Sequence, residues 1–155
     1  MDRAAFIALY GGVYEDSAWV AQEAFPDPER MAAVVEAAPR EARLALIRAH
    51  PQLASRARMA DASVREQAGA GLDACSPEEF ETFQRLNAAY NARFGFPFIV
   101  AVKGLSRQDI LAAFERRLHN DPETEFDEAM RQIHRIAAFR LEALEPAPPA
   151  LGLDV

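Results

Sequence analysis

The hydrophobic residues of this sequence recur every three or four positions over most of its length, which is the spacing of one face of an α-helix. The longest example lies near the C-terminus, where one apolar stripe is formed by Phe126, Met130, Ile133, Ala137 and Leu144. Short clusters of Ser, Asp, Pro and Gly separate such stretches. The pattern predicts an all-α fold consisting of a single compact multi-helix domain.

Residues typical of helix ends give the predicted boundaries of these helices. Asp or Ser before Pro, and Ser followed three residues later by an acid, favour helix N-termini, whereas Gly and Pro favour the ends. On these signals the predicted helices cover residues 27–38, 39–50, 63–68, 76–94, 106–118 and 121–145.

One short apolar run does not have helical spacing. Residues 98–102, Phe-Ile-Val-Ala-Val, resemble a strand, but a lone strand has no partner for its backbone groups. We therefore expect a short extended or irregular segment between helices. Residues 146–155 are rich in proline and are predicted to be a disordered tail, which leaves residues 1–145 as the folded domain.

Composition and charge narrow the possible functions. The chain has 155 residues, 50% of them hydrophobic, and a net charge of −7. Such an acidic chain is not expected to bind nucleic acid, which requires neutralisation of phosphates by Lys and Arg. The one cysteine, Cys75, excludes an internal disulfide and favours a reducing compartment. With no signal-peptide pattern and no apolar run long enough to span a bilayer, we expect a cytoplasmic protein that does not contact membranes.

Arg140 interrupts the apolar stripe of the last predicted helix. A buried guanidinium is costly unless it pairs with an anion or extends to water. An internal salt bridge or an extended side chain is the more common outcome at such a position. The functional alternative is a guanidinium that binds the carboxylate or ureido group of a ligand.

Two other places allow both a structural and a functional interpretation. His50 ends a predicted helix before Pro51, where the free carbonyls should raise the pKa of the imidazole. A histidine there commonly does no more than complement the helix dipole. Ser63 and Glu66 have the spacing of a capping box, which alone explains both residues, although a helix N-terminus also suits an anion.

Several stretches resemble one enzyme family, 2-oxo-4-hydroxy-4-carboxy-5-ureidoimidazoline (OHCU) decarboxylase, and they occur in the family's order. The similar stretches are the opening block 6–20, His-Pro-Gln-Leu-Ala at 50–54, the pattern Ser63, Glu66, Gln67, Ala70, Gly71 and Leu72, Tyr-Asn-Ala-Arg-Phe-Gly-Phe-Pro-Phe-Ile at 90–99, and the pattern Gln132, Ile133, Ile136, Arg140 and Leu141. Together they cover roughly residues 6–145.

The resemblance implies an all-helical homodimer that uses neither a metal nor an organic cofactor and that converts OHCU into (S)-allantoin and CO2 during urate degradation. It assigns His50 as the catalytic acid or base and places Glu66 in the same pocket. From the chemistry of other histidine sites, we expect Glu66 to act as the acid that sets the tautomer of the imidazole. The implied substrate-binding residues are Pro51, Ser63, Gln67, Phe98, Ile99, Val100 and Arg140.

The chemistry of this substrate fits the absence of a cofactor. Electrons left by the departing CO2 can flow into the adjacent C=N bond, so the substrate supplies its own electron sink. Three other interpretations stay open: a related enzyme that acts on another ureido-imidazoline or has lost activity, a non-enzymatic helical interaction module, and a metal-dependent hydrolase. The intact set of His50, Glu66, Gln67 and Arg140 disfavours lost activity, and the lack of a metal-ligand motif disfavours the hydrolase.

Overall fold

The computed structural model describes residues 1–54 and 61–144. Within these ranges the chain is helical and contains no strand, as the spacing of hydrophobic residues predicts. The α-helices are α1 (Arg3–Tyr10), α2 (Trp19–Ala24), α3 (Met31–Ala37), α4 (Arg40–Ala49), α5 (Asp61–Gly69), α6 (Pro77–Phe94), α7 (Arg107–Arg117) and α8 (Pro122–Leu144), with the 3-10 helices η1 (Pro28–Arg30) and η2 (Leu72–Ala74).

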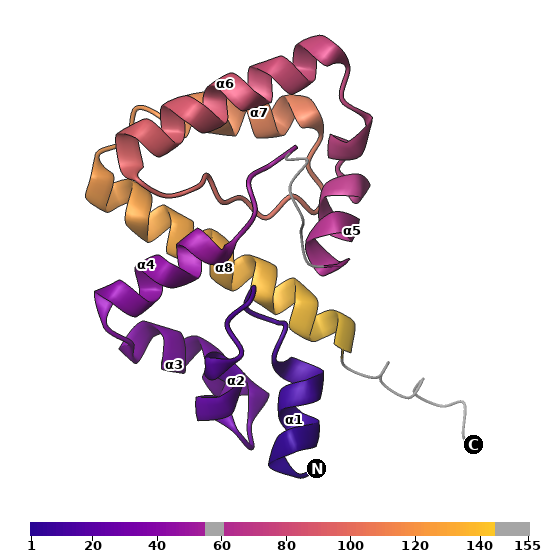
Figure 1. Cartoon of the computed structure of the whole chain (residues 1–155), viewed down its shortest axis with the longest axis vertical. Coiled ribbons are helices and arrows are strands. Elements are labelled where there is room, and N and C mark those ends of the chain that lie inside the picture. The colour runs from indigo at the N-terminus through magenta and orange to yellow at the C-terminus, as the bar shows by residue number, and fades with distance from the viewer. Residues whose placement is uncertain (55–60, 145–155) are drawn as a thin grey trace, which may run out of the picture.

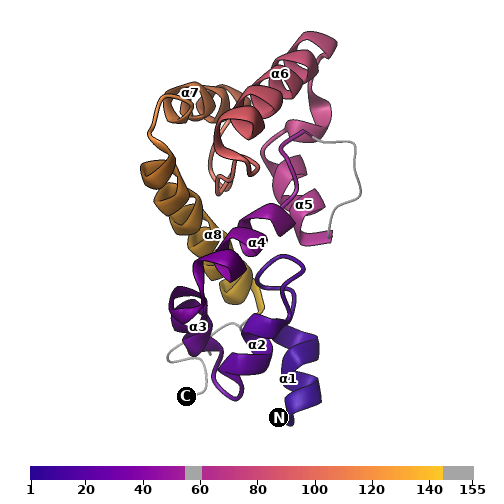
Figure 2. The ribbon, with the colours of Figure 1, turned by 60° about the vertical axis from the view of Figure 1, so that its left-hand side comes forward.

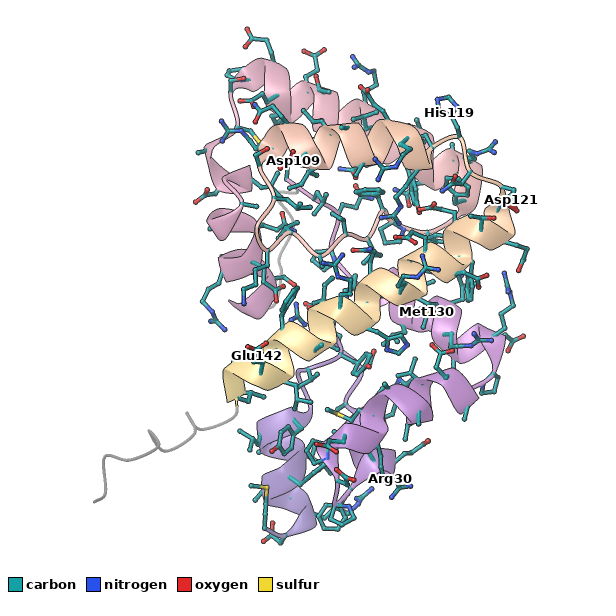
Figure 3. All side chains as sticks on the ribbon, turned by 180° about the vertical axis from the view of Figure 1, so that it is seen from behind. Arg30, Asp109, His119, Asp121, Met130 and Glu142 are labelled. Atoms are coloured by element: carbon teal, nitrogen blue, oxygen red, sulfur yellow. The ribbon has the colours of Figure 1, made fainter. Side chains whose placement is uncertain are left out.

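The longest helix, α8, runs through the middle of the molecule (Figure 1). Helices α1, α2 and α3 gather at one end, α6 and α7 lie side by side at the other, and α4 packs against α8 between them, an arrangement that is also visible after rotation (Figure 2). Seen from behind, His119 and Asp121 mark the turn between α7 and α8, Met130 lies midway along α8, and Glu142 lies near its other end (Figure 3). None of the helices in the described ranges has the length and hydrophobicity needed to cross a membrane.

Most predicted helix boundaries are confirmed, together with the chemistry that sets them. Ser76 and Glu79 form a capping box at the start of α6, which ends at Gly95, a residue with φ of 76°. Ser106 and Asp109 form the same reciprocal pair at the start of α7. Asp27 caps the short 3-10 turn that precedes α3.

The segment 98–102 is irregular and buried, as predicted. Its backbone is bonded by side chains of the neighbouring helices rather than by another strand. Arg117 of α7 donates to the carbonyl of Ile99 at 2.6 Å, and the amide of Ala101 donates to the side chain of Gln132 of α8 at 3.0 Å. Buried backbone groups need such partners, so these two side chains hold the segment in place.

A buried ion pair, which we call the Arg117 cluster, connects α7 to the first turn of α8. Glu125 is fully buried and accepts hydrogen bonds from Arg117 at 2.7 Å, Tyr90 at 2.6 Å and Asn120 at 3.0 Å. The guanidinium of Arg117 also lies 4.3 Å from the ring centre of Phe98. Through these contacts to Phe98 and Ile99, the Arg117 cluster holds the irregular segment 98–102 in place.

Three predictions about the fold are wrong or incomplete. Helix α5 begins at Asp61, before Ser63, so Ser63 and Glu66 lie inside a helix and do not cap one. Helices α1 and α2, which are only 8 and 6 residues long, are not among the helices predicted from the sequence. The apolar stripe of α8 does not reach Leu144, whose exposed fraction is 39%. The predicted tail, residues 146–155, and the end of the last predicted helix lie outside the described residues.

Candidate active site

A cavity of about 290 Å³ lies between the C-terminal end of α4, helix α5, the segment after Phe98 and the second half of α8. All nine residues that the sequence analysis selected line this one cavity: His50, Pro51, Ser63, Glu66, Gln67, Phe98, Ile99, Val100 and Arg140. They come from four separate parts of the chain. The fold therefore brings together residues that are up to 90 positions apart in sequence.

His50 follows the last residue of α4 and is buried, with an exposed fraction of 6%. Its Nδ1 lies 3.0 Å from the carbonyl oxygen of Leu46. Because a carbonyl can only accept, Nδ1 must carry the proton, and in the neutral ring Nε2 then holds the lone pair. The main chain of Leu46, rather than Glu66 as expected, sets the tautomer of the imidazole.

The pKa of His50 is lowered from its ordinary value of 6.5, chiefly because burial removes water from the charged imidazolium. The hydrogen bond to the Leu46 carbonyl acts in the opposite direction but is outweighed. The helix-end carbonyl of Leu46 thus raises this pKa as predicted, but the net shift is downward because burial has the larger effect. At neutral pH, His50 is an uncharged base with its second nitrogen available.

Arg140 is almost completely buried and belongs to a dense group of charges, which we call the Arg140 cluster. Its Nε and Nη2 bind both carboxylate oxygens of Glu66 at 2.9 and 2.8 Å, and Nη2 also donates to Ser63 Oγ at 3.0 Å. Its Nη1 lies 2.9 Å from the carboxylate of Glu15 and 3.3 Å from the carbonyl of Gly12. Although burial alone would lower it, the pKa of Arg140 is raised because Glu66 and Glu15 stabilise the cation.

Ser63 and Glu66 are three residues apart within α5, so both side chains lie on the same face of that helix. This face contacts Arg140 of α8, and the spacing that resembled a capping box instead serves this contact. The side chain of Glu66 remains 31% exposed, whereas that of Arg140 is 7% exposed. Both residues line the cavity, and Glu66 is the more accessible member of the ion pair.

Gln67, also on α5, connects the cavity wall to the segment that follows His50. Its carbonyl oxygen accepts from the amide of Ala54 at 3.0 Å, and its Nε2 donates to the carbonyl of Gln52 at 3.3 Å. Ala54 has a φ of 55°, a left-handed conformation that alanine rarely adopts, and such strain is common beside functional sites. Gln67 therefore holds the backbone beside His50 and Pro51.

Two cationic side chains that the sequence analysis did not select also line the cavity, Arg65 and Lys103. Both are exposed, and the ammonium of Lys103 lies 4.8 Å from the ring centre of Phe139, another lining residue. Arg65 directly precedes Glu66 in the sequence, and Lys103 directly follows the irregular segment 98–102. Their charge gives the cavity a positive contribution within an acidic protein.

Glu15 is the buried acid that sequence reasoning missed. It has an exposed fraction of 2% and contacts both Ser63 and Arg140. One signal was present: like Arg140, it is a charged residue directly beside buried apolar positions, here Val13 and Tyr14. Across the described part of the chain, no group of three or more His, Cys, Asp or Glu side chains is arranged to hold a metal ion.

One cavity thus holds a neutral imidazole, a carboxylate and a guanidinium, groups that are able to carry out acid–base and electrostatic catalysis. The family model described as OHCU decarboxylase matches residues 1–142. The chain therefore belongs to the OHCU decarboxylase family.

Individual relatives agree with this assignment. The chain is 45% identical to the 2-oxo-4-hydroxy-4-carboxy-5-ureidoimidazoline decarboxylase of Haloferax volcanii, over 91% of this chain and 89% of that protein. It is 44% identical to the uric acid degradation bifunctional protein PucL of Bacillus subtilis, over 91% of this chain but only 30% of that longer protein. The crystal structure of an (S)-allantoin synthase is similar with a TM-score of 0.73 and 32% identity, over 93% of this chain and 51% of that one.

Proposed function

We propose that this protein decarboxylates OHCU to (S)-allantoin, with release of CO2, in the degradation of urate. The observation that carries the proposal is the single cavity in which a member of this family gathers His50, Glu66, Gln67 and Arg140. The relatives named for this reaction cover nearly the whole chain. The activity is therefore expected of this domain by itself.

The reaction breaks one carbon–carbon bond. The bond between the hydroxyl-bearing ring carbon and the carboxylate is cleaved, CO2 leaves, and the electron pair moves into the adjacent C=N bond of the ring. A proton must then be added to one face of the planar intermediate to give the S configuration. Because the substrate accepts its own electrons, we propose that the enzyme needs no cofactor.

His50 is proposed as the proton-transfer residue. With Nδ1 donating to Leu46, the Nε2 lone pair can remove the hydroxyl proton of the substrate, and the resulting imidazolium can then return a proton. The lowered pKa keeps the ring neutral before the reaction and makes the imidazolium a ready donor afterwards. One side chain can thus serve both halves of the reaction from a fixed position.

Arg140 and Glu66 are proposed to orient the substrate. The contacts of Arg140 to Glu66, Ser63, Glu15 and Gly12 already use the five N–H donors of a guanidinium. A substrate oxygen can therefore bind Arg140 only by replacing one of these acceptors. Glu66 is the accessible one, so we propose that substrate binding exchanges part of the Arg140–Glu66 contact and places the Glu66 carboxylate against a substrate N–H.

The other side chains selected from the sequence are proposed to complete the binding surface. Pro51, Phe98, Ile99 and Val100 form apolar walls, and Gln67 holds the strained backbone beside His50. We also propose a cytoplasmic homodimer, as the family resemblance and the single cysteine suggest. Light scattering coupled to size-exclusion chromatography at micromolar concentration tests the dimer.

The direct test is the rate at which freshly generated OHCU disappears. Substrate made from urate by the preceding enzymes is followed by absorbance with and without this protein, together with release of CO2. We expect the decay to accelerate in proportion to protein concentration and to be unaffected by a chelator. Decay at the protein-free rate over a wide range of protein concentration would reject the proposed function.

A further inference from the structure

Glu15 lies in the loop between α1 and α2, and this loop is shaped by its own hydrogen bonds. The hydroxyl of Ser17 donates to the Glu15 carbonyl at 2.8 Å, and the amide of Ser17 donates to the Tyr14 carbonyl at 3.1 Å. The next residue, Asp16, is exposed and has a φ of 46°. The turn thus separates two consecutive acids, with Glu15 buried and Asp16 in water.

The carboxylate of Glu15 joins three parts of the chain. Its Oε2 accepts from the hydroxyl of Ser63 on α5 at 2.9 Å and lies 2.9 Å from Nη1 of Arg140 on α8. Acids are almost never buried without a partner, because removal from water strongly disfavours the charged carboxylate. Here the guanidinium of Arg140 is that partner.

The charges of the Arg140 cluster do not balance. One guanidinium faces two acidic side chains, Glu15 and Glu66, so the cluster has one acid in excess. The side chain of Glu15 is 1% exposed and that of Glu66 is 31% exposed. The deeply buried acid is the one that cannot leave Arg140 without remaining unpaired, whereas the accessible acid can turn to a ligand.

We infer that Glu15 is the permanent counter-ion of Arg140 and a positioning residue for the reaction, which leaves Glu66 as the surplus carboxylate that acts on the substrate. This inference rests on the proposed function of the cavity. Glu15 is not among the residues that line the cavity, so it acts on the reaction through Arg140 and Ser63, which it contacts, and through the effect of its charge on His50.

The electrostatic field at His50 supports the same assignment. Burial has the largest effect on the pKa of His50 and lowers it, followed by the Leu46 hydrogen bond, which raises it. Among the charged neighbours, Glu15 raises this pKa more than Glu66 does, and Arg140 lowers it. Removing the charge of Glu15 should therefore lower the pKa of His50 further.

The test is the substitution Glu15→Gln, which keeps the shape of the side chain and removes its charge. We expect kcat to fall about tenfold or more while KM changes by less than about threefold, because a misplaced Arg140–Glu66 pair costs transition-state stabilisation above all. The acid limb of the kcat/KM profile should move to lower pH. Asp16→Asn is the matched control: it removes the neighbouring exposed acid, asparagine tolerates its positive φ, and all three quantities should stay unchanged.

A second readout does not depend on catalysis. The pKa of His50 is measured by NMR, with its signal assigned by its absence in His50→Asn, and should be lower in Glu15→Gln than in the wild type. If the wild type is inactive on OHCU but this shift occurs, the proposed function fails and the electrostatic role of Glu15 stands. If Glu15→Gln is folded and changes neither kcat nor the pKa of His50, the inference about Glu15 is wrong.

If Glu15→Gln does not fold, Glu15→Asp tests the inference instead. This variant keeps the negative charge but moves the carboxylate away from Arg140 by the length of one methylene group. We expect a folded enzyme whose kcat is lowered about tenfold, with the acid limb close to that of the wild type. A value of kcat within about twofold of the wild type would overturn the inference, since the reach of Glu15 would then be irrelevant to the reaction.

Discussion

Helix α8 carries a buried ion-pair cluster near each end, and the two clusters differ in charge balance and in exposure. In the Arg117 cluster, one guanidinium meets one carboxylate, and their side chains are 5% and 0% exposed. In the Arg140 cluster, one guanidinium meets two carboxylates, and one of these, Glu66, is 31% exposed at a cavity. A balanced and closed pair stabilises the fold, whereas an unbalanced and open one can exchange a partner with a ligand.

The two clusters also act on the cavity from different sides. Arg117 holds the carbonyl of Ile99 and packs over Phe98, so it shapes the wall from outside. Arg140 lines the cavity itself. Substitutions in the Arg117 cluster should therefore change stability first, and those in the Arg140 cluster should change activity first.

The largest effect is expected from His50→Asn. A general acid or base contributes about 10²- to 10⁴-fold to a rate, so kcat/KM should fall by about that factor while the thermal transition is retained. His119→Asn, at an exposed histidine on the turn between α7 and α8, is the matched control and should behave as the wild type (Figure 3). Near-wild-type activity of His50→Asn would remove His50 from the reaction.

The second largest effect is expected from Glu125→Gln in the Arg117 cluster. It leaves a buried guanidinium without its counter-charge and should lower the free energy of unfolding by about 3–5 kcal/mol, measured by chemical denaturation. Glu123→Gln is the control, because the Arg40–Glu123 pair is 52% and 71% exposed and should contribute less than about 1 kcal/mol. Equal losses in both variants would contradict the importance of burial.

Glu66→Gln should show the opposite balance. Arg140 keeps Glu15 and Ser63, and Glu66 is partly exposed, so stability should fall by only about 1 kcal/mol. The rate should still fall about tenfold or more, because the surplus carboxylate is lost. Glu142→Gln, on the exposed face of α8, should change neither quantity. A Glu66→Gln enzyme that is much less stable but fully active would contradict the assignment of the Arg140 cluster to activity and of the Arg117 cluster to stability.

The smallest effect concerns pH. Because the folded-state pKa of His50 lies below 6.5, the unfolded chain binds more protons as the pH falls below that value. Stability should therefore decrease on acidification by at most about 1.4 kcal/mol per pH unit, until the pH reaches the folded-state pKa. His50→Asn should have a shallower slope over this range when unfolding is measured at pH 7.5, 6.5 and 5.5. Identical slopes would mean that the burial of His50 does not affect its protonation.

Much of the fold could be predicted because its boundaries depend on local chemistry. The capping boxes at Ser76 and Ser106 and the glycine stop at Gly95 are decided by neighbouring residues. The start of α5 could not be predicted, because Ser63 is bonded by Glu15 and Arg140, residues far away in sequence. A capping box and a site for a distant guanidinium have the same spacing, and only tertiary contacts distinguish them.

The candidate site was predictable to a similar extent. Arg140 was recognisable because a charge interrupts an apolar stripe, and the family motifs supplied His50, Glu66 and Gln67. The direction of the His50 pKa shift was missed, because it depends on burial, which local sequence does not reveal. Glu15 was missed because its function lies entirely in contacts with α5 and α8.

The most direct test of the central claim is the circular dichroism of the allantoin formed from urate by the preceding enzymes, with and without this protein. An unassisted planar intermediate is protonated on both faces, so the protein-free reaction should give optically inactive product. We predict that wild-type protein gives the signal of (S)-allantoin and that His50→Asn gives almost none. Slow, optically inactive product in the presence of wild-type protein would contradict the account.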